Sequence, residues 1–295
     1  MTVKQLFTAL CLSSLLAACV QLPTIEQRSQ QADTLAASHG WVAQALPAGD
    51  FTLQAYLPPS PAAADTLTIY IEGDGLAWLS SDTPSFDPTP LRPLALQLAL
   101  QDPQPAAYLA RPCQYLLAAN PQCRQQYWTS HRFAAEVIAA ASLALDSLKQ
   151  RFQARQLVLV GYSGGGAVAA LLAAKRRDVS GLITVAANLD HRAWTEHNAL
   201  TPLAGSLNAA DDWQDLLPVR QLHFVGGQDA QVGMAALAPF LQRFPPAQQP
   251  PLSLQADYDH HCCWVEHWPA LLQYARGHWQ APDGVRQGAS KSPGL

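Results

Sequence analysis

The stretch Leu157-Val158-Leu159-Val160-Gly161-Tyr162-Ser163-Gly164-Gly165-Gly166 decides how the rest of the chain can fold. Its first four residues are branched and apolar, which is typical of a strand buried on both faces inside a parallel sheet. The run 167–175 that follows is rich in Ala and Leu and contains no helix breaker. The stretch therefore predicts a buried strand, a tight glycine-rich turn and a helix.

Ser163 lies at this turn, with Gly161 two residues before it and Gly165 two residues after it. The Gly-x-Ser-x-Gly spacing between a strand and a helix is typical of a nucleophile elbow. In such an elbow a sharp turn lifts the serine hydroxyl out of the sheet and directs the helix N-terminus at the developing oxyanion. A glycine-rich loop that cradles a phosphate is the alternative interpretation. The buried strand before the turn and the small-residue helix after it favour the nucleophile.

The composition of the chain is that of a globular protein. The 295 residues suit one large α/β domain or two small ones. Hydrophobic residues make up 49% and charged residues 14%, which is enough to build a sizeable core. The net charge is −4 and basic residues are not clustered, so we expect no nucleic-acid partner.

The first residues have the pattern of a signal peptide (1–18) rather than of a folded segment. Lys4 supplies a short positive region, and an apolar run follows that is too short to span a bilayer. Residues 16–19 read Leu-Ala-Ala-Cys, which resembles a bacterial lipobox and implies cleavage before Cys19 and lipidation of its thiol. An ordinary signal peptide cut at the same place is the alternative. Residue 20 is Val rather than Asp, which by resemblance to such lipoproteins favours the outer membrane, with a domain that faces the periplasm.

The rest of the chain is predicted to form one domain. Residues 19–40 are polar and predict a tether from the membrane, whereas residues 282–295, with Gly, Pro and Ser, predict a flexible tail. Between them, residues 41–281 alternate strands with helices, the pattern of a mostly parallel sheet with helices on both faces. The expected strands are 41–42, 51–57, 67–71, 106–110, 157–160, 182–187, 221–225 and 252–256, and the expected helices are 94–101, 131–151, 167–175, 233–243 and 264–275.

Four cysteines lie beyond the predicted signal peptide and lipidation site, in a compartment where disulfides form. Cys113 and Cys123 enclose a short loop, so we expect them to pair with each other. Closing a loop of this size contributes about 2–3 kcal/mol in the chain-entropy model. Cys262 and Cys263 are then either free thiols or a bridge between adjacent residues.

A serine hydroxyl needs a base to become a nucleophile at neutral pH, and the base needs a carboxylate to orient it. In a hydrolase elbow the chain order is serine, then acid, then histidine. Asp229 follows the expected strand 221–225, and His260 follows the expected strand 252–256. Ser163, Asp229 and His260 are therefore the predicted catalytic triad.

The sequence leaves alternatives for both partners of the serine. Asp190, at the end of the strand after the elbow helix, is a second candidate acid, and Asp229 could instead cap a helix. His261 is a second candidate base next to His260. The cluster 260–267 contains His, Cys and Glu, which are zinc ligands. Adjacent side chains at a helix start diverge, however, so we expect no metal site.

An oxyanion hole requires two backbone N–H donors that point at the site. Gly164, which follows the predicted nucleophile at the helix N-terminus, supplies one. The loop 72–75 after the expected strand 67–71 reads Glu-Gly-Asp-Gly, and glycine there allows close approach of the backbone to a ligand. Asp74 is the predicted second donor. An ordinary Gly-Asp-Gly turn is the alternative.

Taken together, these motifs resemble the α/β-hydrolase superfamily, and within it bacterial lipoprotein hydrolases of undefined substrate. The resemblance covers residues 41–280 and implies an eight-stranded type of sheet, a Ser163–His260–Asp229 triad, no organic cofactor and no catalytic metal. One motif departs from the superfamily: Glu72-Gly73 stands where His-Gly is usual, which places a carboxylate near the expected pocket. The matching segments are 69–78, 161–166, 224–229 and 259–264.

The expected activity is hydrolysis of a carboxylic ester with a small-molecule or acyl substrate. A peptidase or amidase with the same triad is one alternative, and a non-catalytic envelope binding protein on the same fold is another. The insert 76–130 and the stretch 191–218 are expected to form pocket walls, although their aromatic side chains equally suit a core. These aromatic residues are Trp78, Phe86, Tyr115, Tyr127, Trp128, Trp194 and Trp213.

Overall fold

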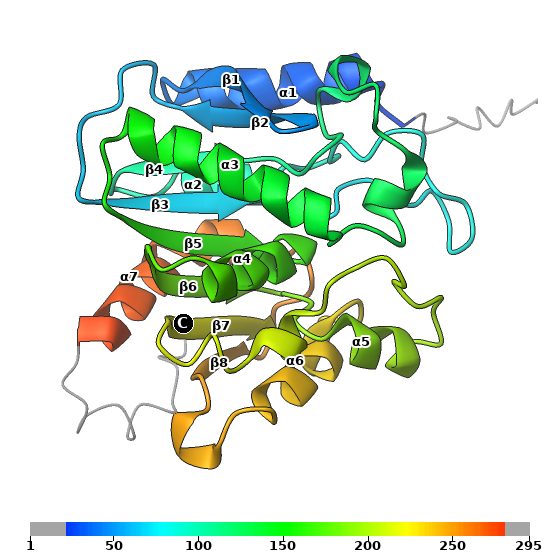
Figure 1. Cartoon of the computed structure of the whole chain (residues 1–295), viewed down its shortest axis with the longest axis vertical. Helices are drawn as coiled ribbons and strands as arrows, with labels where there is room; N and C mark the ends of the chain where they lie inside the picture. The colour runs from blue at the N-terminus through cyan, green and yellow to red at the C-terminus, as the bar shows by residue number, and fades with distance from the viewer. Residues whose placement is uncertain (1–21, 281–295) are drawn as a thin grey trace, which may run out of the picture.

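The computed structural model describes residues 22–280, which contain one eight-stranded sheet (Figure 1). The strand order is β1-β2-β4-β3-β5-β6-β7-β8. The six strands from β4 to β8 in this order run parallel, and β1 and β2 add an antiparallel hairpin at one edge. The strands are β1 (Val42–Ala48), β2 (Phe51–Leu57), β3 (Thr66–Ile71), β4 (Ala106–Leu109), β5 (Gln156–Tyr162), β6 (Val179–Val185), β7 (Arg220–Gly226) and β8 (Leu252–Gln255).

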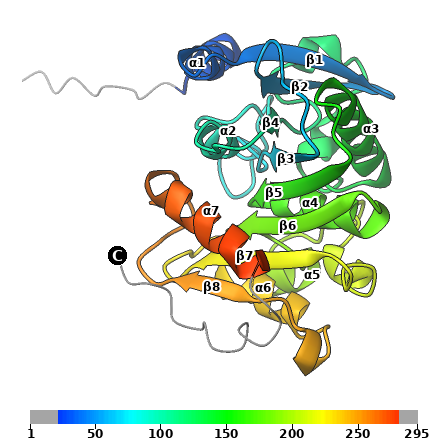
Figure 2. The ribbon, with the colours of Figure 1, turned by 90° about the vertical axis from the view of Figure 1, so that its left-hand side faces the viewer.

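Helices cover both faces of this sheet, as Figure 2 shows. Side chains of α3, α4 and α6 belong to the apolar core on one face, and those of α1, α2 and α7 belong to the core on the other. The predicted single α/β domain with a mostly parallel sheet is confirmed. The helices are α1 (Ile25–Ser38), α2 (Leu94–Ala99), α3 (Ala135–Arg151), α4 (Gly164–Lys175), α5 (His191–His197), α6 (Gly233–Leu241) and α7 (Trp264–Gln280).

The strand that carries the elbow lies in the middle of the sheet. β5 pairs with β3 on one side and with β6 on the other, both in parallel register. Its backbone groups are therefore satisfied on both edges, and α4 returns over it with every residue from Gly164 to Ala173 buried. The loops that follow the parallel strands all leave the sheet at the same edge, which brings distant segments of the chain together.

The polar tether that the sequence predicts over residues 19–40 is wrong for the part that the structure describes. Residues 25–38 form α1, which begins with a capping box between Thr24 and Gln27. Ala32 and Ala36 are fully buried against the core. Because the apolar stripe consists of two small alanines, its hydrophobicity is low, and the segment resembles a solvated linker in sequence.

Arg28 fixes α1 to the loop between β3 and α2. Its guanidinium donates a hydrogen bond to the carbonyl oxygen of Thr89 and lies 3.4 Å from a carboxylate oxygen of Asp87. Both side chains of this ion pair are buried. Removing one partner of a buried pair leaves the other charge uncompensated, so α1 is an integral part of the domain.

Two disulfides are present in the described residues. Cys113 and Cys123 have their sulfur atoms 1.95 Å apart and their Cα atoms 5.8 Å apart, so the structure contains the predicted pair. The adjacent Cys262 and Cys263 are also joined, which decides between the two alternatives. The predicted signal peptide, Cys19 and the tail 282–295 lie outside the described residues. None of the helices described in residues 22–280 is long and apolar enough to cross a membrane.

We expect Arg28→Ala to lower the free energy of unfolding by about 3 kcal/mol, because it leaves the Asp87 carboxylate buried without its counter-charge. Urea unfolding followed by tryptophan fluorescence measures the change. Gln31→Ala, on the exposed side of the same helix, is the matched control and should change stability by less than about 0.5 kcal/mol. Equal small effects of both substitutions would mean that α1 does not dock.

Candidate active site

The turn between β5 and α4 holds Ser163 in a backbone conformation that side chains rarely adopt, with φ at +50° and ψ at −124°. The turn is tight. A Cβ at Gly161 would lie 2.4 Å from the carbonyl oxygen of Gly165, and a Cβ at Gly165 would lie 2.3 Å from the carbonyl oxygen of Ile71. The Ser163 N–H donates to the Val185 carbonyl at 2.9 Å. The sequence spacing therefore corresponds to a real steric requirement.

The structure brings Ser163, His260 and Asp229 together. His260 Nε2 lies 3.0 Å from Ser163 Oγ, and His260 Nδ1 lies 2.8 Å from Asp229 Oδ2. The second carboxylate oxygen accepts the N–H groups of Gln231 and Val232 at 2.9 and 3.0 Å. The imidazole and the carboxylate are both buried. A hydroxyl, an imidazole and a carboxylate thus form one hydrogen-bonded chain.

Asp229 is held in its charged form. Burial alone would raise the pKa of this carboxyl. The hydrogen bond and charge of His260, together with the two backbone N–H groups, lower the pKa by more than burial raises it, so it lies below its ordinary value. An ionised carboxylate only accepts hydrogen bonds, so the proton of the neutral imidazole is on Nδ1. His260 Nε2 is then free to accept the proton of the Ser163 hydroxyl.

Asp190, the alternative acid, has a different role in the structure. Its Oδ1 accepts the N–H groups of Arg192 and Ala193, both at 3.2 Å, and the side-chain amide of Asn208 at 3.0 Å. These contacts make it the N-cap of α5. The residue that contacts the imidazole is Asp229.

His261, the alternative base, contacts Tyr162 and Gln231 rather than the Ser163 hydroxyl. Its Nδ1 lies 2.9 Å from the Tyr162 hydroxyl, and its Nε2 lies 3.3 Å from the side-chain amide nitrogen of Gln231. The same Tyr162 hydroxyl donates to the His260 carbonyl at 3.1 Å. The Asp259 carboxylate accepts the N–H of His261 at 2.7 Å. Tyr162 and Asp259 therefore hold the turn that carries both histidines, and this turn directs only His260 to Ser163.

The two predicted oxyanion donors are neighbours of the nucleophile. A Cβ added to Gly73 would lie 3.3 Å from Ser163 Cβ, and a Cβ added to Gly164 would lie 2.1 Å from an Asp74 carboxylate oxygen. The loop 72–75 therefore packs directly against the elbow. This contact leaves no room for a side chain at Gly164.

Two arginines hold the Asp74 side chain. Arg111 Nη1 lies 3.2 Å from one carboxylate oxygen, and Arg132 Nη1 lies 2.5 Å from the other. Burial tends to raise the pKa of Asp74, but the charges of Arg132 and Arg111 outweigh it and lower the pKa below its ordinary value. A carboxylate bridged by two buried guanidiniums has little freedom to move, so the backbone N–H of Asp74 is fixed in place.

Glu72, which stands where the superfamily usually has His, is buried beside the cavity with only 1% of its surface exposed. Its Oε1 accepts the N–H groups of Gly73 at 2.9 Å and of Ala95 at 3.5 Å, while its Oε2 has no hydrogen-bond partner among the described residues. Burial raises the pKa of Glu72 to about 7. The expected carboxylate near the pocket is thus present, and it titrates near neutral pH.

Ser163 and His260 line a cavity of about 670 Å³. The insert 76–130 and the stretch 191–218 both contribute to its walls, but of the seven aromatic residues in them only Trp78 and Trp194 line it. The others pack in or near the core, except for exposed Phe86. The apolar lining residues include Leu76, Ala77, Trp78, Leu91, Trp194, Leu200, Leu203 and Val232.

Two polar residues that line this cavity, Asn188 and Arg92, were not predicted from the sequence. Asn188 is buried beside the nucleophile, and its N–H lies 3.4 Å from the Ser163 carbonyl oxygen. Its side-chain oxygen has no hydrogen-bond partner within residues 22–280. Its place just after the end of β6 is the signal that could have found it, because active-site residues in this architecture follow the carboxyl ends of strands. Arg92 lies in an irregular loop, and no sequence pattern marks it.

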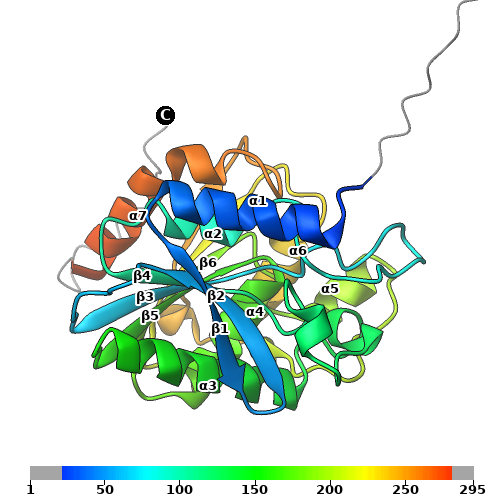
Figure 3. The same ribbon diagram turned by 90° about the horizontal axis from the view of Figure 1, so that it is seen from above.

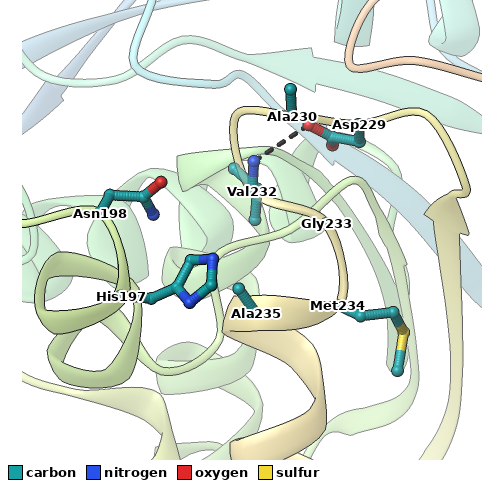
Figure 4. Close-up of a pocket in the computed structure, with 8 residues that line it drawn as sticks. All are labelled: His197, Asn198, Asp229, Ala230, Val232, Gly233, Met234 and Ala235. Carbon is teal, nitrogen blue, oxygen red and sulfur yellow. Dashed lines mark hydrogen bonds between the residues drawn. The ribbon is translucent and has the colours of Figure 1, made fainter.

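A second hollow, of about 450 Å³, is lined by Asp229 and by residues that follow it (Figure 4). His197 and Asn198 at the end of α5 face the loop 229–233 across it, and the dashed line in Figure 4 marks the bond from the Val232 N–H to the Asp229 carboxylate. Neither Ser163 nor His260 lines this hollow. Val232 lines both this hollow and the cavity that contains the nucleophile, so the two lie next to each other.

No group of three or more His, Cys, Asp or Glu side chains in residues 22–280 is arranged to hold a metal ion. The sequence-based expectation of no organic cofactor and no catalytic metal stays a prediction.

No protein-family model and no curated protein sequence matches the chain. Solved structures do match. The Pyrococcus furiosus esterase Pf2001 has a TM-score of 0.54 at 11% identity, covering 81% of this chain and 91% of that one. Est1E from Butyrivibrio proteoclasticus has a TM-score of 0.53 at 13% identity, covering 80% and 99%. A 2,6-dihydroxy-pseudo-oxynicotine hydrolase has a TM-score of 0.55 at 16% identity, covering 92% and 76%. These likenesses show that the chain has the predicted α/β-hydrolase fold.

We expect the stability of the wild type to fall, relative to that of Glu72→Gln, as the pH rises. The folded pKa of Glu72 is above that of the unfolded chain, so the folded state binds more protons between about pH 4.5 and pH 7. The free energy of unfolding of the variant minus that of the wild type should rise by about 2.5 kcal/mol between pH 5 and pH 8. Urea unfolding at both pH values measures it. Glu136→Gln, at an exposed carboxylate on α3, should follow the wild-type trend. A constant difference for Glu72→Gln would contradict the assignment.

Proposed function

We propose that this protein is a serine hydrolase that cleaves carboxylic esters through an acyl-enzyme intermediate. The observation that carries the proposal is the hydrogen-bonded chain from Ser163 Oγ through His260 to Asp229, at the wall of a cavity large enough for a substrate. The solved structures with the same fold include proteins named as esterases and a hydrolase, which agrees with this activity. The apolar walls of the cavity suit an ester with an apolar acyl or alcohol part.

In the first half of the proposed reaction, His260 Nε2 takes the proton of the Ser163 hydroxyl as its oxygen attacks the ester carbonyl carbon. The carbonyl oxygen becomes an oxyanion, which the N–H groups of Gly164 and Asp74 stabilise. His260 then gives its proton to the leaving alcohol oxygen, and the acyl group remains on Ser163. Asp229 keeps the imidazole in the required tautomer and stabilises its charged form.

In the second half, a water molecule takes the place of the alcohol. His260 removes a proton from the water as it attacks the acyl carbon, and the same two N–H groups hold the second oxyanion. The acid leaves, and the proton returns to Ser163. The fixed position of Asp74 between its two arginines suits this role, because an oxyanion hole is effective when its donors need no rearrangement.

We also propose that the protein is a lipoprotein of the cell envelope, anchored through Cys19 and facing the periplasm, in the outer membrane. The support is the Leu-Ala-Ala-Cys sequence after a short apolar run, with Val20 following it. The two disulfides agree with an oxidising compartment.

We expect a fluorophosphonate to add to wild-type protein at a single site and not to add to Ser163→Ala, because only an activated serine oxygen attacks the phosphorus centre. Intact-protein mass spectrometry measures the adduct. Hydrolysis of a small activated ester should fall by about 10³-fold or more in the same variant. A folded wild-type protein that forms no adduct would overturn the hydrolase proposal.

The adjacent histidines provide a matched control for this experiment. His260→Ala should lose the adduct and the ester hydrolysis, whereas His261→Ala should retain both within about tenfold, because only His260 contacts Ser163. Loss of the adduct and of ester hydrolysis in His261→Ala but not in His260→Ala would identify His261 as the base instead.

We expect Cys19→Ala to move the protein from the detergent-rich to the aqueous phase in a phase-partition assay on protein made in a Gram-negative host, because it removes the only thiol at the predicted lipidation position. Cys11→Ala, inside the predicted signal peptide, is the control and should partition like the wild type. Wild-type protein in the aqueous phase would contradict the anchor.

A further inference from the structure

Large apolar side chains are exposed around the mouth of the active-site cavity. We call Trp78, Leu79, Phe86 and Leu200 the apolar rim. Their exposed fractions are 39%, 45%, 85% and 41%. Trp78 and Leu200 also line the cavity, whereas Leu79 and Phe86 lie outside its lining. Exposed apolar groups gathered at one place mark an interaction site, while scattered ones do not.

Three of these side chains belong to one protruding loop. A bridge between Trp78 and Pro84 and a hydrogen bond from the Leu79 N–H to the Thr83 carbonyl at 2.8 Å give the loop a hairpin shape. In Figure 1 the loop between β3 and α2 stands out from the side of the molecule to which the parallel strands point. Leu79 and Phe86 on this loop are both exposed to solvent.

The start of α1 lies beside the same loop. Arg28, in the first turn of α1, contacts Asp87 and Thr89, which lie one and three residues after Phe86 in the chain. Figures 1 and 3 both show the N-terminal end of α1 on the side of the molecule where this loop protrudes. Because α1 is docked, the chain that connects it to Cys19 is short: only the six steps from residue 19 to residue 25 remain, which reach at most about 20 Å.

The short connection from Cys19 to α1 and the apolar rim lie at the same end of the domain, which would place the rim close to a membrane that holds Cys19. We propose that the apolar rim docks on the surface of a phospholipid bilayer and that the enzyme takes its ester from that bilayer, so that its substrate is an acyl ester of a membrane lipid. This inference rests on the proposed function for its chemistry and on the proposed Cys19 anchor for the position of the bilayer.

The charge at the mouth agrees with a phospholipid surface. Arg92 is exposed, lines the same cavity and forms no ion pair with any residue in the described part of the chain. A guanidinium there suits the phosphate of a lipid headgroup. The acyl chain then lies along the apolar walls, with its ester carbonyl at Ser163. Hydrolysis adds one water and releases a fatty acid and the lipid alcohol, the proton passing through His260 as above.

The test compares two esters on the full-length protein reconstituted in vesicles of phosphatidylcholine and phosphatidylglycerol. One is a fluorogenic phospholipid ester in the bilayer, and the other is a water-soluble acetate ester. The double variant Leu79→Ser/Phe86→Ser should slow hydrolysis of the bilayer ester about tenfold or more and change that of the soluble ester less than about threefold. The control, Leu143→Ser/Leu217→Ser, replaces two exposed leucines elsewhere on the domain, which are 46% and 42% exposed, and should match the wild type on both esters.

A second measurement reports docking without catalysis. Phospholipids with brominated acyl chains quench a tryptophan that enters the bilayer. Trp78 should be quenched in the wild type and in Ser163→Ala, the Trp78→Phe variant should lose this quenching, and Leu79→Ser/Phe86→Ser should reduce it.

If Ser163→Ala is quenched but the wild type hydrolyses neither ester, docking stands and the proposed function fails. If quenching and hydrolysis of the bilayer ester are unchanged in the double variant, docking is overturned. A rim variant that instead shifts a dimer to a monomer, without quenching in the wild type, assigns the rim to a second copy of the chain and also overturns docking.

Discussion

The backbone turn at Ser163 is the constraint on which the rest of the structure depends. A residue with φ at +50° costs on the order of 1–3 kcal/mol, and it persists only where its surroundings leave no other conformation. Pairing of β5 with strands on both sides and burial of α4 supply those surroundings. Since the turn stands at the carboxyl edge of the sheet, the loops after β3, β6, β7 and β8 converge on it, and each contributes one part of the site.

The buried charged side chains near the turn fix the position of the loop 72–75 more than they increase the stability of the fold. Asp74, Arg111 and Arg132 are largely removed from water. The free energy that such charged groups lose on desolvation is offset by their mutual attraction only when the geometry of the ion pairs is good. Their contacts connect three segments that are distant in sequence: the loop after β3, the end of β4 and the turn before α3. The result is a rigid loop beside Ser163. Glu72 adds a carboxyl that loses or gains a proton near neutral pH in the same loop.

Much of the fold follows from patterns in the sequence because parallel strands and their helices have distinct periodicities. The elbow, the strand that precedes Asp229 and the turn that precedes His260 were all predictable from short motifs. His260 was predicted as the base with His261 as the alternative, because adjacent side chains in a turn diverge according to backbone angles that periodicity does not encode. α1 was missed since two buried alanines give little hydrophobic signal. Arg92 enters the cavity from an irregular loop, and only the three-dimensional structure places it there.

The site is completed by the last part of the chain. His260 stands between β8, an edge strand, and α7, whose Trp264 indole donates to the Asp259 carbonyl at 3.0 Å and whose Trp268 donates to the Tyr70 hydroxyl at 3.1 Å. Docking of these two buried tryptophans secures the turn that presents the imidazole. A chain is made from its N-terminus, so the serine and the acid exist before the base. Under the proposed function, a nascent chain therefore stays inactive until α7 has packed, and loss of α7 removes the support of the base before it disturbs the elbow.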